Sequence, residues 1–193
     1  RRLGSPPLEL RGHVEFRTLT SSKQVDMIAQ LATSRVLEAV DLSAVGLDDN
    51  GAKHVADHLL GPHGPPGLAR VALENNCILE SGALAICESL RSNSCLTELT
   101  LAGQKQRTFP ARVVLSFCAA LEESNWTLKR LNLGDFDDRA NHIRQRLSRV
   151  VMRNADHVRK ERLRVTLARD TPAGLGAASP SPVSSAARGS LFS

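Results

Sequence analysis

The chain is poor in aromatic side chains, which make up 3% of its 193 residues, and it contains no tyrosine. Proteins that bind single-stranded nucleic acid stack the bases on aromatic side chains, so this composition argues against that class. Hydrophobic residues nevertheless make up 41% of the chain, which is enough for a folded core. The sequence therefore predicts a globular domain with an aliphatic core, built largely from its 28 leucines.

Long apolar runs and enzyme motifs are also missing. No stretch reaches the roughly 18 apolar residues that identify a transmembrane helix, and no apolar signal sequence follows Arg1 and Arg2. We therefore expect no membrane insertion and a cytoplasmic location. The chain has no glycine-rich phosphate loop, dinucleotide fingerprint or nucleophile elbow. These absences predict a protein that is not an enzyme and has no cofactor and no small-molecule substrate.

Metal-binding patterns are weak. The four cysteines form no C-x-x-C pair, and they are Cys77, Cys87, Cys95 and Cys118. This spacing does not match a zinc site, so we expect reduced, mostly buried thiols. His54 and His58 are four residues apart on a predicted helix. Such a pair can hold a metal ion, but a solvated helix surface is the preferred interpretation.

One aliphatic phrase occurs four times and predicts the fold. Its copies start at Leu37, Leu68, Leu96 and Leu128, which are 31, 28 and 32 residues apart. In each copy, positions 1, 4 and 6 are aliphatic. This L-x-x-L-x-L phrase is typical of leucine-rich repeats. Its last two aliphatic residues alternate along a short strand and therefore point to one side, into the interior.

Each of the first three phrases is followed by an apolar pattern with helical spacing. The first helix is predicted near residues 50–60, with inward side chains Ala52, Val55, Ala56, Leu59 and Leu60. In the second the inward side chains are predicted to be Leu79, Ala83, Ile86, Cys87 and Leu90. In the third, near 110–123, they are Val113, Val114, Phe117, Cys118 and Leu121. A further helix over 22–33 indicates an incomplete repeat before the first phrase.

The fourth phrase is followed by a longer amphipathic helix, predicted over residues 139–166. Its apolar stripe contains Ile143, Leu147, Val150, Val151, Asn154 and Val158. A solenoid exposes the apolar face of its last repeat, and this helix is expected to cover it. The predicted fold class is α/β: a short leucine-rich-repeat solenoid of parallel strands and α-helices, closed by a C-terminal amphipathic helix.

The same patterns divide the chain into four parts. Residues 1–21 are expected to form an N-terminal extension, and residues 22–138 the partial first repeat and the four phrases. The capping helix over 139–166 follows. Residues 167–193 are rich in Pro, Ser and Ala and are expected to be a disordered tail.

Positive charge is concentrated at the C-terminal end of the solenoid. The formal net charge of the whole chain is +5, but residues 128–170 alone carry 12 Lys and Arg against 6 Asp and Glu, a net charge of +6. This basic helix is either an ordinary solvated face or an electrostatic docking surface for an acidic partner. No nucleic-acid-binding motif is present, and the apolar stripe is needed to close the repeats. A protein partner is therefore preferred over nucleic acid or a membrane.

Four segments resemble the C-terminal domain of tropomodulin and leiomodin. They are LENNCILESGAL (73–84), ESLRSNSCLTEL (88–99), LEESNWTL (121–128) and, most specifically, NADHVRKERL (154–163). The resemblance covers about residues 37–165. It implies binding to actin, at the pointed end of the filament or as monomers, and association with the cytoskeleton. Actin is acidic, which suits the basic terminal helix.

The resemblance implies that the terminal helix and the loops after the strands contact the partner. The candidate residues on the helix are Arg144, Arg146, Arg149, Arg153, Arg159, Lys160 and Arg162. Those in a polar loop are Gln104, Lys105 and Arg107. The alternative function is a structural scaffold in a cytoskeletal, ciliary or signalling assembly with a partner other than actin.

The triplet Asn125-Trp126-Thr127 matches the acceptor pattern for N-glycosylation. The repeat explains it better, because Asn93 occupies the same place before the preceding phrase. Both asparagines are therefore predicted to lie in the turn where a helix ends. Trp126 is expected to be a partly packed loop residue.

Overall fold

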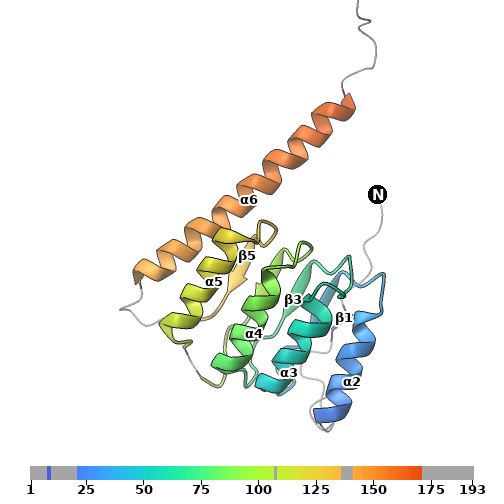
Figure 1. The fold of residues 1–193 in the computed structure, drawn as a ribbon, viewed down its shortest axis with the longest axis vertical. Coiled ribbons are helices and arrows are strands. Elements are labelled where there is room, and N and C mark those ends of the chain that lie inside the picture. The colour runs from blue at the N-terminus through green and yellow to red at the C-terminus, as the bar shows by residue number, and fades with distance from the viewer. Residues whose placement is uncertain (1–7, 10–20, 107, 136–140, 171–193) are drawn as a thin grey trace, which may run out of the picture.

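The computed structural model describes residues 8–9, 21–106, 108–135 and 141–170, in which strands and helices alternate (Figure 1). The strands are β1 (Leu8–Glu9), β2 (Ala39–Asp41), β3 (Arg70–Ala72), β4 (Glu98–Thr100) and β5 (Arg130–Asn132). The helices are α2 (Ser21–Ala32), α3 (Asp49–His54), α4 (Glu80–Leu90), α5 (Ala111–Glu123) and α6 (Asn141–Asp170). Helix α3 continues directly into the π-helical segment η1 (Val55–Leu60).

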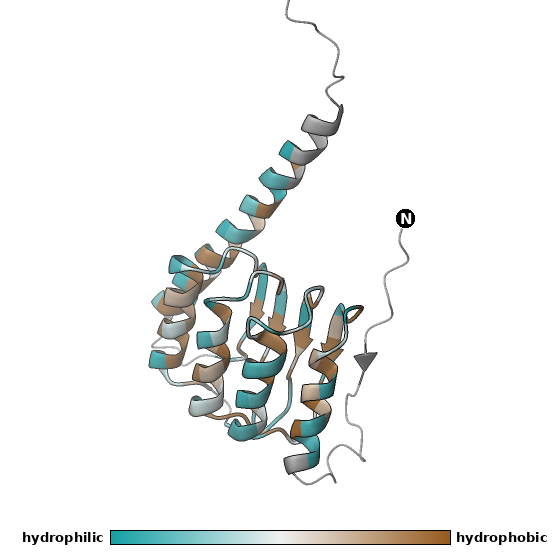
Figure 2. Cartoon of the chain, turned by 45° about the vertical axis from the view of Figure 1, so that its right-hand side comes forward, coloured by the Kyte–Doolittle hydropathy of each residue, from teal (hydrophilic) through white to brown (hydrophobic). Residues whose placement is uncertain are grey.

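The strands form one parallel sheet in chain order, β1-β2-β3-β4-β5. The middle residues of four strands are in register, and they are Val40, Val71, Leu99 and Leu131. Helices line one side of this sheet (Figure 2). Each repeat therefore adds one strand to the sheet and one helix to the layer of helices. This confirms the predicted α/β leucine-rich-repeat solenoid. Strand β1, which the sequence did not predict, supplies the partial first repeat with a strand of its own.

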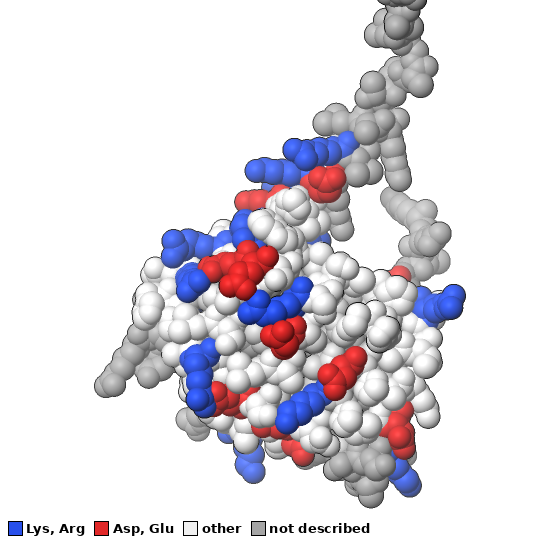
Figure 3. All heavy atoms as spheres, in the orientation of Figure 1, with Lys and Arg blue, Asp and Glu red and all other residues white. Residues whose placement is uncertain are grey.

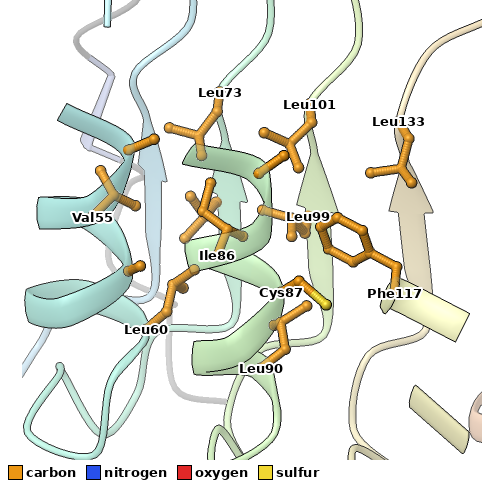
Figure 4. Packing of buried hydrophobic residues seen from close by; sticks show 14 of the residues in the cluster. Val55, Leu60, Leu73, Ile86, Cys87, Leu90, Leu99, Leu101, Phe117 and Leu133 are labelled. Carbon is orange, nitrogen blue, oxygen red and sulfur yellow. The ribbon is translucent and has the colours of Figure 1, made fainter. Parts of the chain in front are cut away.

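The core lies between the sheet and the helices, as the two apolar patterns predicted (Figure 4). The last residues of the phrases are buried, with Leu42, Leu73 and Leu101 at 0% exposure. All the predicted inward residues of the first and third helices are buried as well. The prediction for Leu79 was wrong, because α4 begins at Glu80 and the Leu79 side chain is 44% exposed.

Two of the cysteines belong to this core. Cys87 and Cys118 occupy equivalent positions on α4 and α5 and are buried free thiols, whereas Cys77 and Cys95 are half-buried. Burial raises the pKa of the Cys87 thiol to about 12, and it also raises the pKa of Cys118. Because both thiols stay protonated at neutral pH, they act as small apolar side chains rather than nucleophiles.

Asparagine side chains connect successive repeats at the helix exits. The Asn93 amide donates to the Leu60 carbonyl at 2.9 Å, and its oxygen accepts from the amides of Cys95 and Leu96. Asn125 repeats this pattern by donating to the carbonyls of Leu90 and Asn93, both at 2.8 Å. Each side chain therefore bonds polar backbone groups at the end of one helix to those of the next turn. This confirms that both asparagines lie in helix-exit turns, and we call them, together with Asn154, the asparagine ladder.

Asn154 continues the ladder from the terminal helix α6. Its amide donates to the carbonyls of Asn125 at 2.9 Å and Leu128 at 3.1 Å, and its side chain is fully buried. The α6 side chains of Ile143, Leu147 and Val150 are buried against the last repeat. Helix α6 therefore closes the solenoid as the sequence predicted.

The described part of α6 runs from Asn141 to Asp170, so the helix ends four residues later than the predicted 166. The predicted start at residue 139 lies outside the described residues. A helix of 30 residues is about 45 Å long. Its C-terminal half extends beyond the body of the solenoid (Figure 1). Residues 167–170 therefore belong to the helix rather than to the tail, and residues 171–193 lie outside the described part of the chain.

We expect Asn125→Ala to lower the free energy of unfolding by about 2 kcal/mol or more, because it leaves buried carbonyls and amides without partners. Asn50→Ala is the matched control, since Asn50 is exposed and its substitution should change stability by no more than about 0.5 kcal/mol. Urea unfolding followed by circular dichroism measures both. Equal unfolding midpoints for the two variants would contradict a structural role for the ladder.

Candidate partner-binding surface

Helix α6 holds most of the predicted partner-binding residues, and packing divides it into two parts. From Ile143 to Asn154 one side of the helix is buried against the last repeat. Beyond Val158, which is half-buried, the side chains of residues 159, 160, 161, 163 and 164 are all exposed. The first part therefore fixes the direction of the helix, and the second presents its side chains to solvent.

Arg146 forms contacts with another helix of the same domain. Its Nε donates to Glu122 on α5 at 2.8 Å, and a second guanidinium nitrogen forms an ion pair with the same carboxylate. This hydrogen bond lowers the pKa of Glu122, and the charges of Arg146, Arg153 and Arg149 act in the same direction. Arg146 therefore fastens α6 to α5, although both side chains are accessible to solvent.

Arg153 is also held by the protein itself. Its guanidinium donates to the carbonyls of Leu121 at 2.6 Å and Glu122 at 3.3 Å, which lie at the C-terminal end of α5. The same group lies 3.7 Å from the centre of the Trp126 ring. A cation over an indole face is attracted to it, and the positive charge also suits the exit end of α5. Arg153 thus connects α6, α5 and the following turn.

Trp126 completes a small cluster at this turn. The indole forms an edge-on contact with the imidazole of His157, with ring centres 5.4 Å apart. We call Trp126, Arg153 and His157 the tryptophan cluster. Nearby Asn125 is 1% exposed and its amide donates two hydrogen bonds. A glycan on that nitrogen is incompatible with this fold. The sequence placed Trp126 correctly in a turn but did not reveal its neighbours, which are about 30 positions away.

Besides Arg146, four candidate residues of α6 are exposed, and they are Arg144, Arg149, Arg159 and Lys160. Arg149 lies close enough to Glu122 to lower the pKa of that carboxyl. No ion pair within 4 Å joins Arg159 or Lys160 to a carboxylate among the described residues. Arg144 is exposed at the other end of α6, about 22 Å from Arg159 along the axis. Arg162 lies in the helix, and its side chain lies outside the described part of the structure.

The polar loop after β4 contributes less than the sequence predicted. Gln104 is only 4% exposed, and its amide donates to the carbonyls of Leu73 and Leu101 while its oxygen accepts from the amide of Ile78. This side chain is part of the solenoid interior and is not free to contact a partner. Lys105 is exposed, and Arg107 lies outside the described residues.

A groove of about 330 Å³ lies between α6 and the last strand, β5. Its apolar lining includes Met152, which is 67% exposed. The residues along it are Leu131, Asn132, Leu133, Gly134, Arg144, Leu147, Ser148, Val151 and Met152. Arg144 also lines an adjoining hollow with Gln104 and Asp135. Sequence reasoning missed this groove, because it forms only where the terminal helix crosses the last repeat.

Charges on the helical face are mixed rather than uniformly basic (Figure 3). Ion pairs between successive repeats account for part of this pattern, and they include Arg91–Glu123 and Arg112–Glu80. On the sheet side, Arg130 of β5 pairs with Glu98 of β4 at 3.2 Å. The net charge of +6 therefore overstates the charge offered to a partner, because Arg130 and Arg146 are paired with carboxylates of neighbouring repeats.

Metal binding and membrane insertion receive no support from the described residues. His54 and His58 stack with ring centres 5.8 Å apart, but the described part holds no group of three His, Cys, Asp or Glu side chains that could share a metal ion. Within the same residues, no helix is long and apolar enough to cross a membrane.

We expect Arg146→Gln to raise the pKa of Glu122 toward its ordinary value, because the strongest favourable contact of the carboxylate is lost. A carboxyl group whose pKa is lower in the folded than in the unfolded chain stabilises the folded state at pH values above its unfolded-state pKa. This stabilisation is lost as the pH falls through the folded-state pKa. The variant should therefore lose stability at neutral pH and less at acidic pH. Carbon-detected NMR titration measures the pKa, with Arg159→Gln as control. An unchanged Glu122 titration would contradict this contact.

No family model matches the chain, but solved structures with the same fold are known. The C-terminal domain of tropomodulin from Caenorhabditis elegans superposes with a TM-score of 0.69 and 19% identity, covering 81% of this chain and 88% of that one. Actin-binding site 2 of leiomodin-1 gives a TM-score of 0.73 and 24% identity, covering 83% of this chain and 88% of that one. The chain therefore has a fold like that of the tropomodulin and leiomodin C-terminal domains.

Proposed function

We propose that this domain is a non-enzymatic actin-binding module, which docks on actin mainly through the exposed basic end of α6. The observation that carries the proposal is the fold shared with a domain known as an actin-binding site of leiomodin-1. Residues 154–163, which carry the most specific part of the resemblance in sequence, begin at the last ladder residue, Asn154, and contain Arg159 and Lys160. The proposal implies a cytoplasmic, cytoskeleton-associated protein.

The contacts of α6 separate the arginines that hold the helix in place from the cations that are available to a partner. Arg146 and Arg153 hold the helix on α5, whereas Arg159 and Lys160 are exposed and form no ion pair with the described residues. Neither side chain has to give up an ion pair with the described residues to meet a carboxylate of a partner, and complementary charge speeds encounter with an acidic partner. Arg159 and Lys160 are therefore the proposed primary contacts, and Arg149 is a secondary one.

The distance between the exposed cations suits a large partner. Arg144 lies near the start of α6, about 22 Å along the helix axis from Arg159. One protein surface of ordinary interface size spans that distance, whereas a small ligand does not. We propose that binding takes place at the pointed end of the filament or on actin monomers. The alternative, a scaffold for another protein, predicts no actin binding.

We expect the double substitution Arg159→Glu and Lys160→Glu to weaken actin binding at least tenfold. Two favourable charges become repulsive on an acidic partner, and the effect should be larger at low ionic strength because salt screens exposed charges. Pointed-end elongation of pyrene-labelled actin with capped barbed ends, together with cosedimentation and monomer binding, measures the loss. Thermal unfolding should be nearly unchanged, since both side chains are exposed and neither forms an ion pair within 4 Å with the described residues.

The matched control is Arg70→Glu with Lys53→Glu, which also reverses two exposed positive charges, on β3 and α3. This control should bind actin like the unmodified chain. If the unmodified chain at micromolar concentration neither cosediments with filaments, nor slows pointed-end growth, nor binds monomers, the actin proposal is wrong. A partner recovered by affinity capture would then identify the scaffold function.

A further inference from the structure

Trp126 is the only tryptophan of the chain, and it is held in place at the surface. Its side chain is 42% exposed. Arg153 lies over the ring at 3.7 Å, and His157 contacts it edge-on. The turn beneath it is fixed by Asn125, whose oxygen accepts from the amides of Thr127 and Leu128. The indole is therefore an ordered, partly exposed apolar surface.

Arg153 is held in this position by hydrogen bonds other than its contact with Trp126. It donates to two carbonyls at the end of α5 and to Asn154, which belongs to the asparagine ladder. The cation that orders Trp126 is thus fixed by the contact that closes the solenoid. An aromatic side chain already ordered in the free protein loses little conformational entropy when a partner covers it.

The surface next to the tryptophan cluster is basic. Arg149 is four residues before Arg153 on α6, and Lys160 is three residues after His157. Residues at these spacings are neighbours on one face of a helix. Asp156 and Glu161 are exposed acidic residues of the same stretch. Cations therefore predominate along the line from Arg149 to Lys160, which passes beside the exposed indole.

We infer that the tryptophan cluster is the apolar anchor of the partner interface, and that it receives an acidic segment of actin with an apolar side chain placed over Trp126. This inference rests on the proposed function and adds the part of the surface that decides affinity. Tryptophan and arginine are the residues most enriched among those that dominate binding energy, and they act where water is excluded. Arg149 and Lys160 supply the complementary charge around the indole.

Hydroxyl-radical footprinting of the unmodified chain tests this placement without any substitution. Trp126 should be oxidised readily in the free chain and protected at least threefold when saturated with actin. Leu79 is the internal comparison, because it is similarly exposed at 44% but lies beside the start of α4. Its oxidation should not change. Binding without protection of Trp126 overturns the inference and leaves the actin proposal intact.

Substitution provides the second test. Trp126→Ala should weaken actin binding at least tenfold, Trp126→Phe should retain most of the affinity, and Leu79→Ala should bind normally. Thermal unfolding of each variant shows whether the domain remains folded. If the Trp126→Ala variant is folded and its affinity for actin is within twofold of that of the unmodified chain, the inference is overturned. Absence of actin binding by the unmodified chain overturns the proposed function and this inference together.

Discussion

The structure depends on how backbone groups at the helix exits are satisfied. Asn93 and Asn125 bond carbonyls at the end of one repeat to the turn of the next, and Asn154 bonds carbonyls of the last such turn to α6. An unpaired buried carbonyl or amide costs free energy comparable to a lost hydrogen bond, so loss of any of these three asparagines would weaken the contact between the repeats that it joins. The ladder ends on α6, which makes the closing helix part of the repeat system.

This closure explains why the basic end of the helix is available to a partner. Arg146 and Arg153 hold the first part of α6 on α5, and the buried stripe ends near Asn154. The helix continues to Asp170 with exposed cations, so its direction is set by packing and its outer part remains in solvent. The same contacts order Trp126, which lies where the two parts meet.

The sequence predicted the fold well, because the repeated phrase shows at once where each strand lies, which of its side chains face the core and how long each repeat is. It also predicted α6 as a closing helix from the stripe at Ile143 and Leu147. It could not distinguish a structural from an exposed polar residue, since Gln104 and Lys105 look alike in sequence but only Gln104 is buried. Likewise, the contact of Arg153 with Trp126 depends on folding across 27 positions.

Truncation of α6 tests the central claim most directly, because closure is assigned to the part of the helix up to Asn154, and the proposed primary charged contacts, Arg159 and Lys160, lie after Val158. Chains ending at residues 170 and 158 both retain Asn154 and the buried stripe. The account predicts that both unfold at nearly the same temperature, and that the chain ending at 158 binds actin at least tenfold more weakly than the one ending at 170. Equal actin affinity, or unfolding of the shorter chain, would contradict it.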